Sequence, residues 1–132
     1  MNTYIKGIIA TLGAVVGAWC GGWDMGFKIL VSLVLLDYLT GVLSAIYQRQ
    51  LSSSIGFKGI IKKVAIFIVL VMGVRLDILL ESGDMLRMGI IFFYSANEGI
   101  SILENLKKME VTLPSFLMKI LEVLKQKADD TK

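Results

Sequence analysis

Ionisable side chains inside long apolar runs are the residues of this chain with the clearest chemical potential. Asp37 and Glu98 each interrupt such a run, and Arg75 and Asp77 stand together in a third. An ionised group at the centre of a membrane helix costs on the order of 2.5 to 3.5 kcal/mol on insertion scales, so these groups are expected to face a partner helix, a cavity or water. A buried acid can bind a proton or a cation. It can also pair with a base and simply hold helices together, and the sequence leaves both interpretations open.

Other residue types exclude most enzyme chemistry. The sequence has no His and a single Cys, Cys20, which rules out imidazole catalysis, His-containing zinc sites and an internal disulfide. It contains no phosphate-binding loop and no dinucleotide-binding glycine motif, and nothing supplies a nucleophile beside the acids. We therefore expect a protein that is not an enzyme and that holds no cofactor and no metal.

The composition is typical of a membrane protein. Of 132 residues, 55% are hydrophobic and 19% are charged, against roughly 45–50% apolar and about 25% charged in soluble domains. Apolar runs predict helices near residues 5–23, 27–47, 64–80 and 87–106, each close to the roughly 20 residues that cross a bilayer. The expected fold class is an all-α integral membrane protein, with about four antiparallel transmembrane helices in a domain of residues 1–106.

The positions of the basic residues predict the orientation in the membrane. The connection between the second and third runs carries Arg49, Lys58, Lys62 and Lys63 without an acid, which by the positive-inside rule places it in the cytoplasm. Both termini are then expected in the cytoplasm as well, and the net charge of +3 reflects topology rather than nucleic-acid binding. A signal peptide is the alternative for the first run, but no convincing cleavage site precedes Trp19.

Polar residues recur at helical spacing on the second and fourth runs. On the second run they are Asp37, Thr40, Gly41, Ser44 and Gln48, and on the fourth they are Tyr94, Asn97, Glu98, Ser101 and Asn105. Together with Arg75 and Asp77, these stripes supply the candidates for intramembrane polar or pore-lining positions. Arg75 is expected to pair with Asp37 or to extend toward the lipid headgroups.

Small residues mark one face of the first run. Gly13, Gly17 and Gly21 recur at every fourth position, which is typical of helices that pack closely in lipid. These glycines are the candidates for a helix-packing or oligomer contact. The partner can be another helix of this chain or a second copy.

The connection from Gln48 to Lys63 mixes glycines with apolar and basic residues, so we expect an interfacial hinge. Phe57 would enter the bilayer boundary while Lys58, Lys62 and Lys63 meet anionic headgroups. A solvated turn is the alternative.

Residues 107–132 are expected to form a cytoplasmic amphipathic helix and a charged tail. An apolar stripe follows Pro114 and comprises Phe116, Leu117, Ile120, Leu121 and Leu124. This stripe is expected to lie on the inner leaflet or to pack in an oligomer.

Two groups of residues resemble the toxin-secretion and phage-lysis holin family. The first group is Asp37, Tyr38, Leu39, Thr40 and Gly41, followed by Ser54, Gly56, Phe57, Lys58, Gly59, Ile60, Lys62 and Lys63. The second group is Asn97, Glu98, Gly99, Ser101, Ile102, Glu104 and Asn105, followed by Pro114, Ser115, Phe116 and Leu117. The resemblance spans about residues 30–127 and is specific as a combination.

The resemblance implies a small phage or prophage protein that accumulates in the bacterial cytoplasmic membrane and oligomerises into a lesion. Its implied partners are the lipid bilayer, further copies of itself, and an endolysin or large toxin that is released without specific binding; no cofactor and no nucleic acid is implied. The main alternative is a small ion-coupled transporter or channel that uses Asp37 and Glu98. A passive membrane scaffold is a third interpretation.

Overall fold

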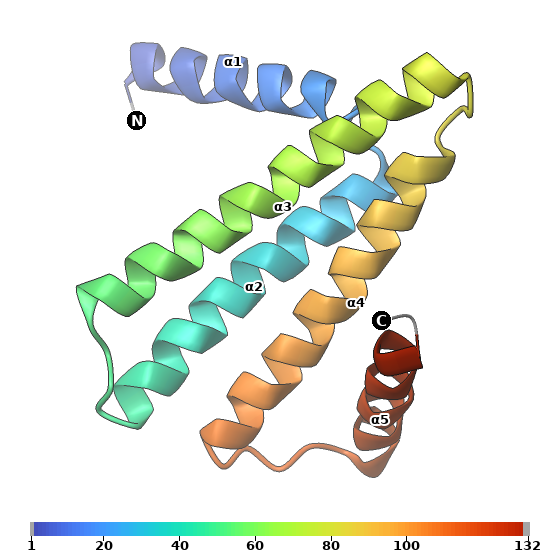
Figure 1. Ribbon diagram of the computed structural model, residues 1–132. Coiled ribbons are helices and arrows are strands. Elements are labelled where there is room, and N and C mark those ends of the chain that lie inside the picture. The colour runs from blue at the N-terminus through green and yellow to red at the C-terminus, as the bar shows by residue number, and fades with distance from the viewer. Residues whose placement is uncertain (1, 131–132) are drawn as a thin grey trace.

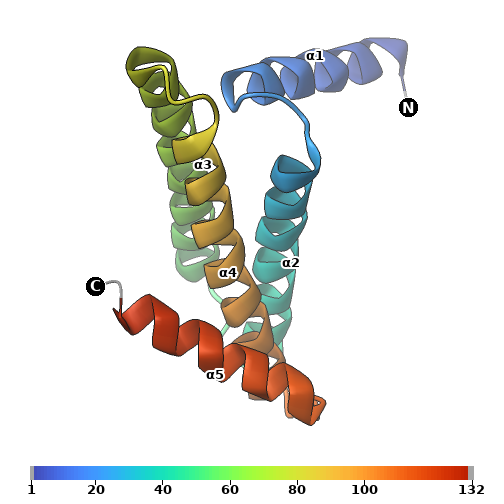
Figure 2. The ribbon, with the colours of Figure 1, turned by 90° about the vertical axis from the view of Figure 1, so that its right-hand side faces the viewer.

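The structure is a computed structural model that describes residues 2–130, and it is all-helical over that range. The helices are α1 (Thr3–Trp19), α2 (Met25–Tyr47), α3 (Ser53–Leu80), α4 (Met85–Lys108) and α5 (Ser115–Asp130). Helices α2, α3 and α4 run side by side as an antiparallel bundle, in which α4 packs against both neighbours (Figure 1). Helix α1 lies across one end of this bundle, and α5 leaves the other end (Figure 2).

The first apolar run does not join the bundle as a fourth antiparallel helix, and this corrects the expected arrangement. The run ends as a helix at Trp19 because Gly21 and Gly22 adopt φ values of +93° and +108°, which favour glycine and redirect the chain. The Trp23 side chain folds back onto α1, and its Nε1 donates a hydrogen bond of 2.9 Å to the Gly13 carbonyl. Trp23 also occupies the space that a side chain at position 17 would need.

The three glycines of the predicted packing face therefore have different surroundings. Gly17 accommodates a side chain of the same molecule, and Gly21 lies in the turn against the Arg87 side chain. A Cβ atom at Gly13 would meet no atom within 4 Å, so that part of the face stays open.

Helix α3 begins well inside the segment that we expected to be an interfacial hinge. The Ser52 hydroxyl caps it by accepting a hydrogen bond of 3.2 Å from the Ile55 N–H. Two glycines of its first turns lie against the Tyr38 side chain of α2. A Cβ atom at Gly56 would lie 3.4 Å from the Tyr38 hydroxyl, and one at Gly59 would lie 3.5 Å from the Tyr38 ring. These glycines permit close helix packing, whereas the sequence pattern alone indicated a flexible connection.

The apolar core fills the half of the bundle that lies nearer α1. Its buried members are Cys20, Phe27, Leu30, Val34, Ile66, Leu70 and Ile91. Phe27 is the central ring, with edge-on contacts to Trp23 at 4.6 Å and to Phe67 at 6.1 Å between ring centroids.

The outer surface of the bundle is also apolar. Large exposed hydrophobic side chains include Leu35, Leu39, Ile68, Met72 and Phe92. Among the described helices, α2 is the one long and apolar enough to cross a membrane, with a mean hydropathy of 2.2 over its most apolar stretch. Helix α1 is apolar but has only 17 residues, and α3 and α4 carry several charges.

Helix α5 confirms the expectation of a helix after Pro114. Leu121 is buried, whereas Phe116, Ile120 and Val123 are exposed. The connection before α5 is tied to the end of α2, because the Tyr47 hydroxyl donates a 2.6 Å hydrogen bond to Glu110. Within the charged tail, the helix continues to Asp130, and residues 131–132 lie outside the described range.

Candidate functional site

One charged side chain from each bundle helix meets at a buried cluster near the middle of α2 and α4. Asp37 of α2 and Glu98 of α4 are only 7% and 5% exposed. Lys63 of α3 reaches both acids: its Nζ donates to Glu98 Oε2 at 2.7 Å and forms a second ion pair with the Asp37 carboxylate. We refer to these three residues as the charge cluster.

Asn105 of α4 completes the polar surroundings of Asp37. Its Nδ2 donates hydrogen bonds of 3.0 Å to Asp37 Oδ1 and to Thr40 Oγ1, and it lies 3.3 Å from the Asp37 carbonyl oxygen. The Thr40 hydroxyl donates to the Leu36 carbonyl at 2.8 Å. The polar stripes of α2 and α4 thus face one another instead of facing lipid.

Most of the other stripe residues lie at or near this contact, whereas Gln48 is exposed at the end of α2 and Tyr94 packs against the apolar core. Ser44 is buried, and Gly41 lies beside Asn105, where a Cβ would be 3.6 Å from Nδ2. Asn97 and Ser101 are half-buried on α4.

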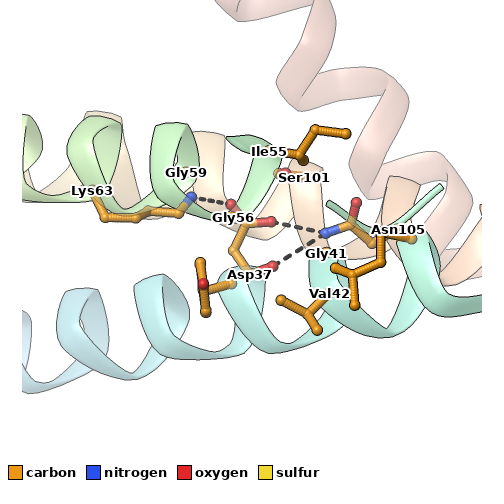
Figure 3. Close-up of a pocket in the computed structure, with 12 residues that line it drawn as sticks. Asp37, Gly41, Val42, Ile55, Gly56, Gly59, Lys63, Ser101 and Asn105 are labelled. Carbon is orange, nitrogen blue, oxygen red and sulfur yellow. Dashed lines mark hydrogen bonds and ion pairs between the residues drawn. The ribbon is translucent and has the colours of Figure 1, made fainter. Parts of the chain in front are cut away.

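A cavity of about 210 Å³ opens beside the charge cluster (Figure 3). It lies between the cluster and the bundle end that carries the Gln48–Ser52 connection, because its lining comes from α2 after Asp37, α3 before Lys63 and α4 after Glu98. The lining residues are Asp37, Tyr38, Gly41, Val42, Ala45, Leu51, Ile55, Gly56, Gly59, Lys63, Ser101 and Asn105. The glycines and the alanine among them leave this space empty of protein atoms.

The four residues predicted as an interfacial loop therefore separate into two groups. Phe57, Lys58 and Lys62 are exposed on the first turns of α3, but Lys63 turns inward to the acids. Sequence reasoning missed this role of Lys63 because it placed the residue before the start of a helix. The useful signal was the charge balance, since two buried acids on separate helices require a nearby base.

A second ionic contact joins the buried Arg87 to the exposed Asp24 at the bundle end near α1. Arg87 is 1% exposed. Its guanidinium donates to the Asp24 carboxylate at 2.6 and 3.2 Å, to the Cys20 carbonyl at 2.6 Å and to the Gly22 carbonyl at 2.9 Å. Hydrogen bonding to Arg87, helped by the Phe27 N–H, lowers the pKa of the Asp24 carboxyl below its ordinary value. These contacts fix the turn between α1 and α2 against the start of α4.

Asp77 has a structural role at the same end. Its carboxylate accepts hydrogen bonds from the backbone N–H groups of Leu86 and Arg87 at 2.9 and 2.8 Å, and from the Ser82 hydroxyl at 2.6 Å. A carboxylate at this position satisfies the free N–H groups of the first turn of α4 and complements its dipole.

Arg75 does not pair with Asp37. Its guanidinium lies 5.9 Å from the centroid of the Trp19 ring, which is a cation–π contact between α3 and the end of α1. Arg75 was the wrong base for the acids because it lies on the α1 side of the core, whereas Asp37 lies beyond the core.

The charge cluster can hold or transfer a proton, but it has no group suited to covalent chemistry. Within residues 2–130, no set of three His, Cys, Asp or Glu side chains is arranged to hold a metal ion. The arrangement is that of an ionic contact between three helices with a cavity of about 210 Å³ beside it.

Comparisons with known proteins cover most of the chain. The sequence profile of the bacteriophage holin family matches residues 14–126. The chain is 44% identical over 124 residues to an uncharacterised protein of Clostridium perfringens strain 13, covering 93% of this chain and 92% of that one. It is 39% identical over 130 residues to an uncharacterised protein of Listeria innocua, covering 98% and 93% of the two chains.

A further similar protein carries a functional name. The chain is 30% identical over 101 residues to the "Probable holin" of Bacillus phage phi105, covering 76% of this chain and 75% of the phage protein. No solved structure matches. Since the profile covers residues 14–126 and the phage relative is 30% identical over 76% of this chain, this chain belongs to the bacteriophage holin family, a family of membrane proteins rather than enzymes.

Proposed function

We propose that this protein is a holin that accumulates in the bacterial cytoplasmic membrane and oligomerises into a lesion. Through that lesion an endolysin, or a large toxin, leaves the cytoplasm, and the moment of opening sets the time of host lysis. The observation that carries the proposal is the family match over residues 14–126.

The distribution of apolar and charged side chains supports this function. Leu35, Ile68 and Phe92 on the outside of the bundle are exposed, as lipid-facing residues would be. Asp37 and Glu98 are enclosed by neighbouring helices, so a single copy hides the groups that an open assembly would present to water.

A multi-pass topology is part of the proposal. Arg49, Lys58, Lys62, Lys107 and Lys108 all belong to the bundle end opposite α1, which favours a cytoplasmic location for that end. The C-terminal helix would then be cytoplasmic. A cytoplasmic N-terminus additionally requires α1 to cross the membrane, and it stays a prediction.

The deciding experiment is inducible expression in bacteria with and without a co-expressed cytoplasmic endolysin that lacks its own export signal. Membrane potential and culture density are followed together. A holin gives a delayed and abrupt depolarisation, followed by lysis that depends on the endolysin. Graded, substrate-selective ion flux without killing would instead support a transporter or channel, and intact cells with abundant inserted protein would support a scaffold.

A further inference from the structure

The packing of the bundle differs on the two sides of the charge cluster. On the side of α1, the side chains of Phe27, Leu30 and Leu70 are completely buried in the apolar core. On the other side, the cavity extends from Asp37 to Leu51 in the connection between α2 and α3. The cluster therefore meets the cavity on one side and the apolar core on the other.

The formal charges of the cluster do not balance. Asp37 and Glu98 contribute two carboxylates, and Lys63 contributes one ammonium group, which leaves a formal charge of −1. The nearby polar groups are neutral: Thr40, Ser101 and Asn105 at the acids, and Tyr38 on the cavity wall. Both carboxylates contact the same Lys63 Nζ, so they lie close together, and two like charges in one buried site favour a proton on one of them.

We propose that Asp37, Lys63 and Glu98 form a binding site for one proton, which exchanges with water only through the cavity at the Gln48–Ser52 end. A hydronium ion in the cavity transfers its proton to a carboxylate oxygen and leaves as water. The loaded cluster is neutral: one carboxyl group carries the proton, and the other stays paired with the Lys63 ammonium.

This site links the proton concentration at one bundle end to the packing of three helices. Loss of the proton leaves an unbalanced negative charge between α2 and α4, which favours an arrangement where water reaches the acids. The inference goes beyond the proposed lysis function and holds for the closed, single bundle.

Infrared difference spectroscopy of the purified full chain in lipid nanodiscs tests the site directly. We expect a protonated-carboxyl band near neutral pH that disappears as the pH rises and shifts in D₂O. Glu98→Gln or Asp37→Asn should abolish this band, whereas Glu81→Gln at the exposed end of α3 should leave it unchanged. Absence of the band near neutral pH in the unmodified chain, or its persistence in both cluster variants, would overturn the proposal.

A second measurement tests the one-sided access. In a Cys20→Ser background, Ala45→Cys or Val42→Cys places a thiol in the cavity wall, and Leu35→Cys places one on the exposed face of the same helix. After reaction with a bulky thiol reagent, the carboxyl band should respond to a pH jump several-fold more slowly in the cavity variants than in the Leu35→Cys control. Equal response rates in labelled cavity and control variants would show that protons reach the acids by another route.

Neither measurement depends on lysis. A chain that loads the proton but fails to release endolysin would leave the site intact and refute the holin proposal. A chain that lyses cells but shows no pH-dependent carboxyl band would support the holin proposal and overturn the proton site.

Discussion

Two basic residues of α3 show that the position of a charged side chain decides how much it contributes to stability. Lys63 lies between two buried acids, whereas Arg75 is exposed and contacts an aromatic ring. Removal of one partner from a buried ion pair leaves the other charge without compensation, while exposed contacts contribute little. The substitutions that test these roles are therefore expected to differ greatly in their effects.

Lys63→Met is expected to lower the free energy of unfolding of the bundle by about 3 to 5 kcal/mol, because it leaves Asp37 and Glu98 buried without a base. The neighbouring exposed Lys62 is a matched control, and Lys62→Met should stay within about 0.5 kcal/mol of the unmodified chain. Denaturation in mixed micelles, followed by circular dichroism, measures both values. Equal losses in the two variants would show that Lys63 does not hold the cluster together.

Asp24 should make the stability depend on pH in the acidic range. Arg87 lowers the pKa of Asp24 in the folded chain from its ordinary 3.8, so the unfolded chain binds a proton at a higher pH than the folded chain does. The stabilisation is fully present above pH 3.8 and is lost as the pH falls through the lower, folded pKa. Denaturation measured at a series of acidic pH values checks this. Asp24→Asn should remove this loss of stability at low pH, and Glu81→Gln should retain it.

At the scale of the elements, helix ends depend on contacts with other helices. Helix α4 has no side-chain cap of its own and is capped by Asp77 from α3. Helix α3 extends through two glycines because these lie against Tyr38 of α2. Helix α1 ends at a turn that Arg87 of α4 holds in place.

The two glycines of α1 are expected to respond differently to substitution. Gly17→Leu should displace the Trp23 indole, which occupies the space beside position 17, and so release α1 from the turn. Gly13→Leu should leave this contact unchanged, because nothing lies within 4 Å of the added Cβ. Tryptophan fluorescence in a Trp19→Phe background reports the environment of Trp23, and identical spectra for the two variants would argue against the observed position of α1.

Gly13→Leu also tests the open part of the small-residue face. If copies of the chain associate through α1, this variant should lose cross-linked oligomers while keeping the spectrum of the unmodified chain. Gly7→Leu, at another open position on α1, is the control. Unchanged cross-linking in Gly13→Leu would exclude this face as the contact between copies.

At the scale of the whole molecule, the bundle has one end with α1 and the Arg87 contacts, and a second end with α5 and most of the bases (Figure 1). If the second end is cytoplasmic, its exposed residues are protected from reagents outside the cell.

In a Cys20→Ser background, Asp84→Cys at the turn between α3 and α4 should react with a membrane-impermeant maleimide on intact cells. Gln50→Cys and Lys108→Cys, which belong to the opposite end, should react only after permeabilisation. Labelling of Gln50→Cys on intact cells would reverse the proposed orientation. An intact cytoplasmic marker in the same cells must accompany the labelling, since an open lesion would admit the reagent.

Composition and a repeat of 3.6 residues were enough to predict the helical class, the apolar character and the polar stripes of α2 and α4. They also placed Asp37 and Glu98 among the residues that need a partner. The identity of that partner depended on tertiary packing. Three bases, Lys63, Arg75 and Arg87, lie in or near apolar runs of the sequence. Only the packing of the three helices brings Lys63 to the acids and buries Arg87 at the turn. The position of α1 was decided in the same way, because a local repeat of small residues cannot distinguish a second helix from the indole of Trp23.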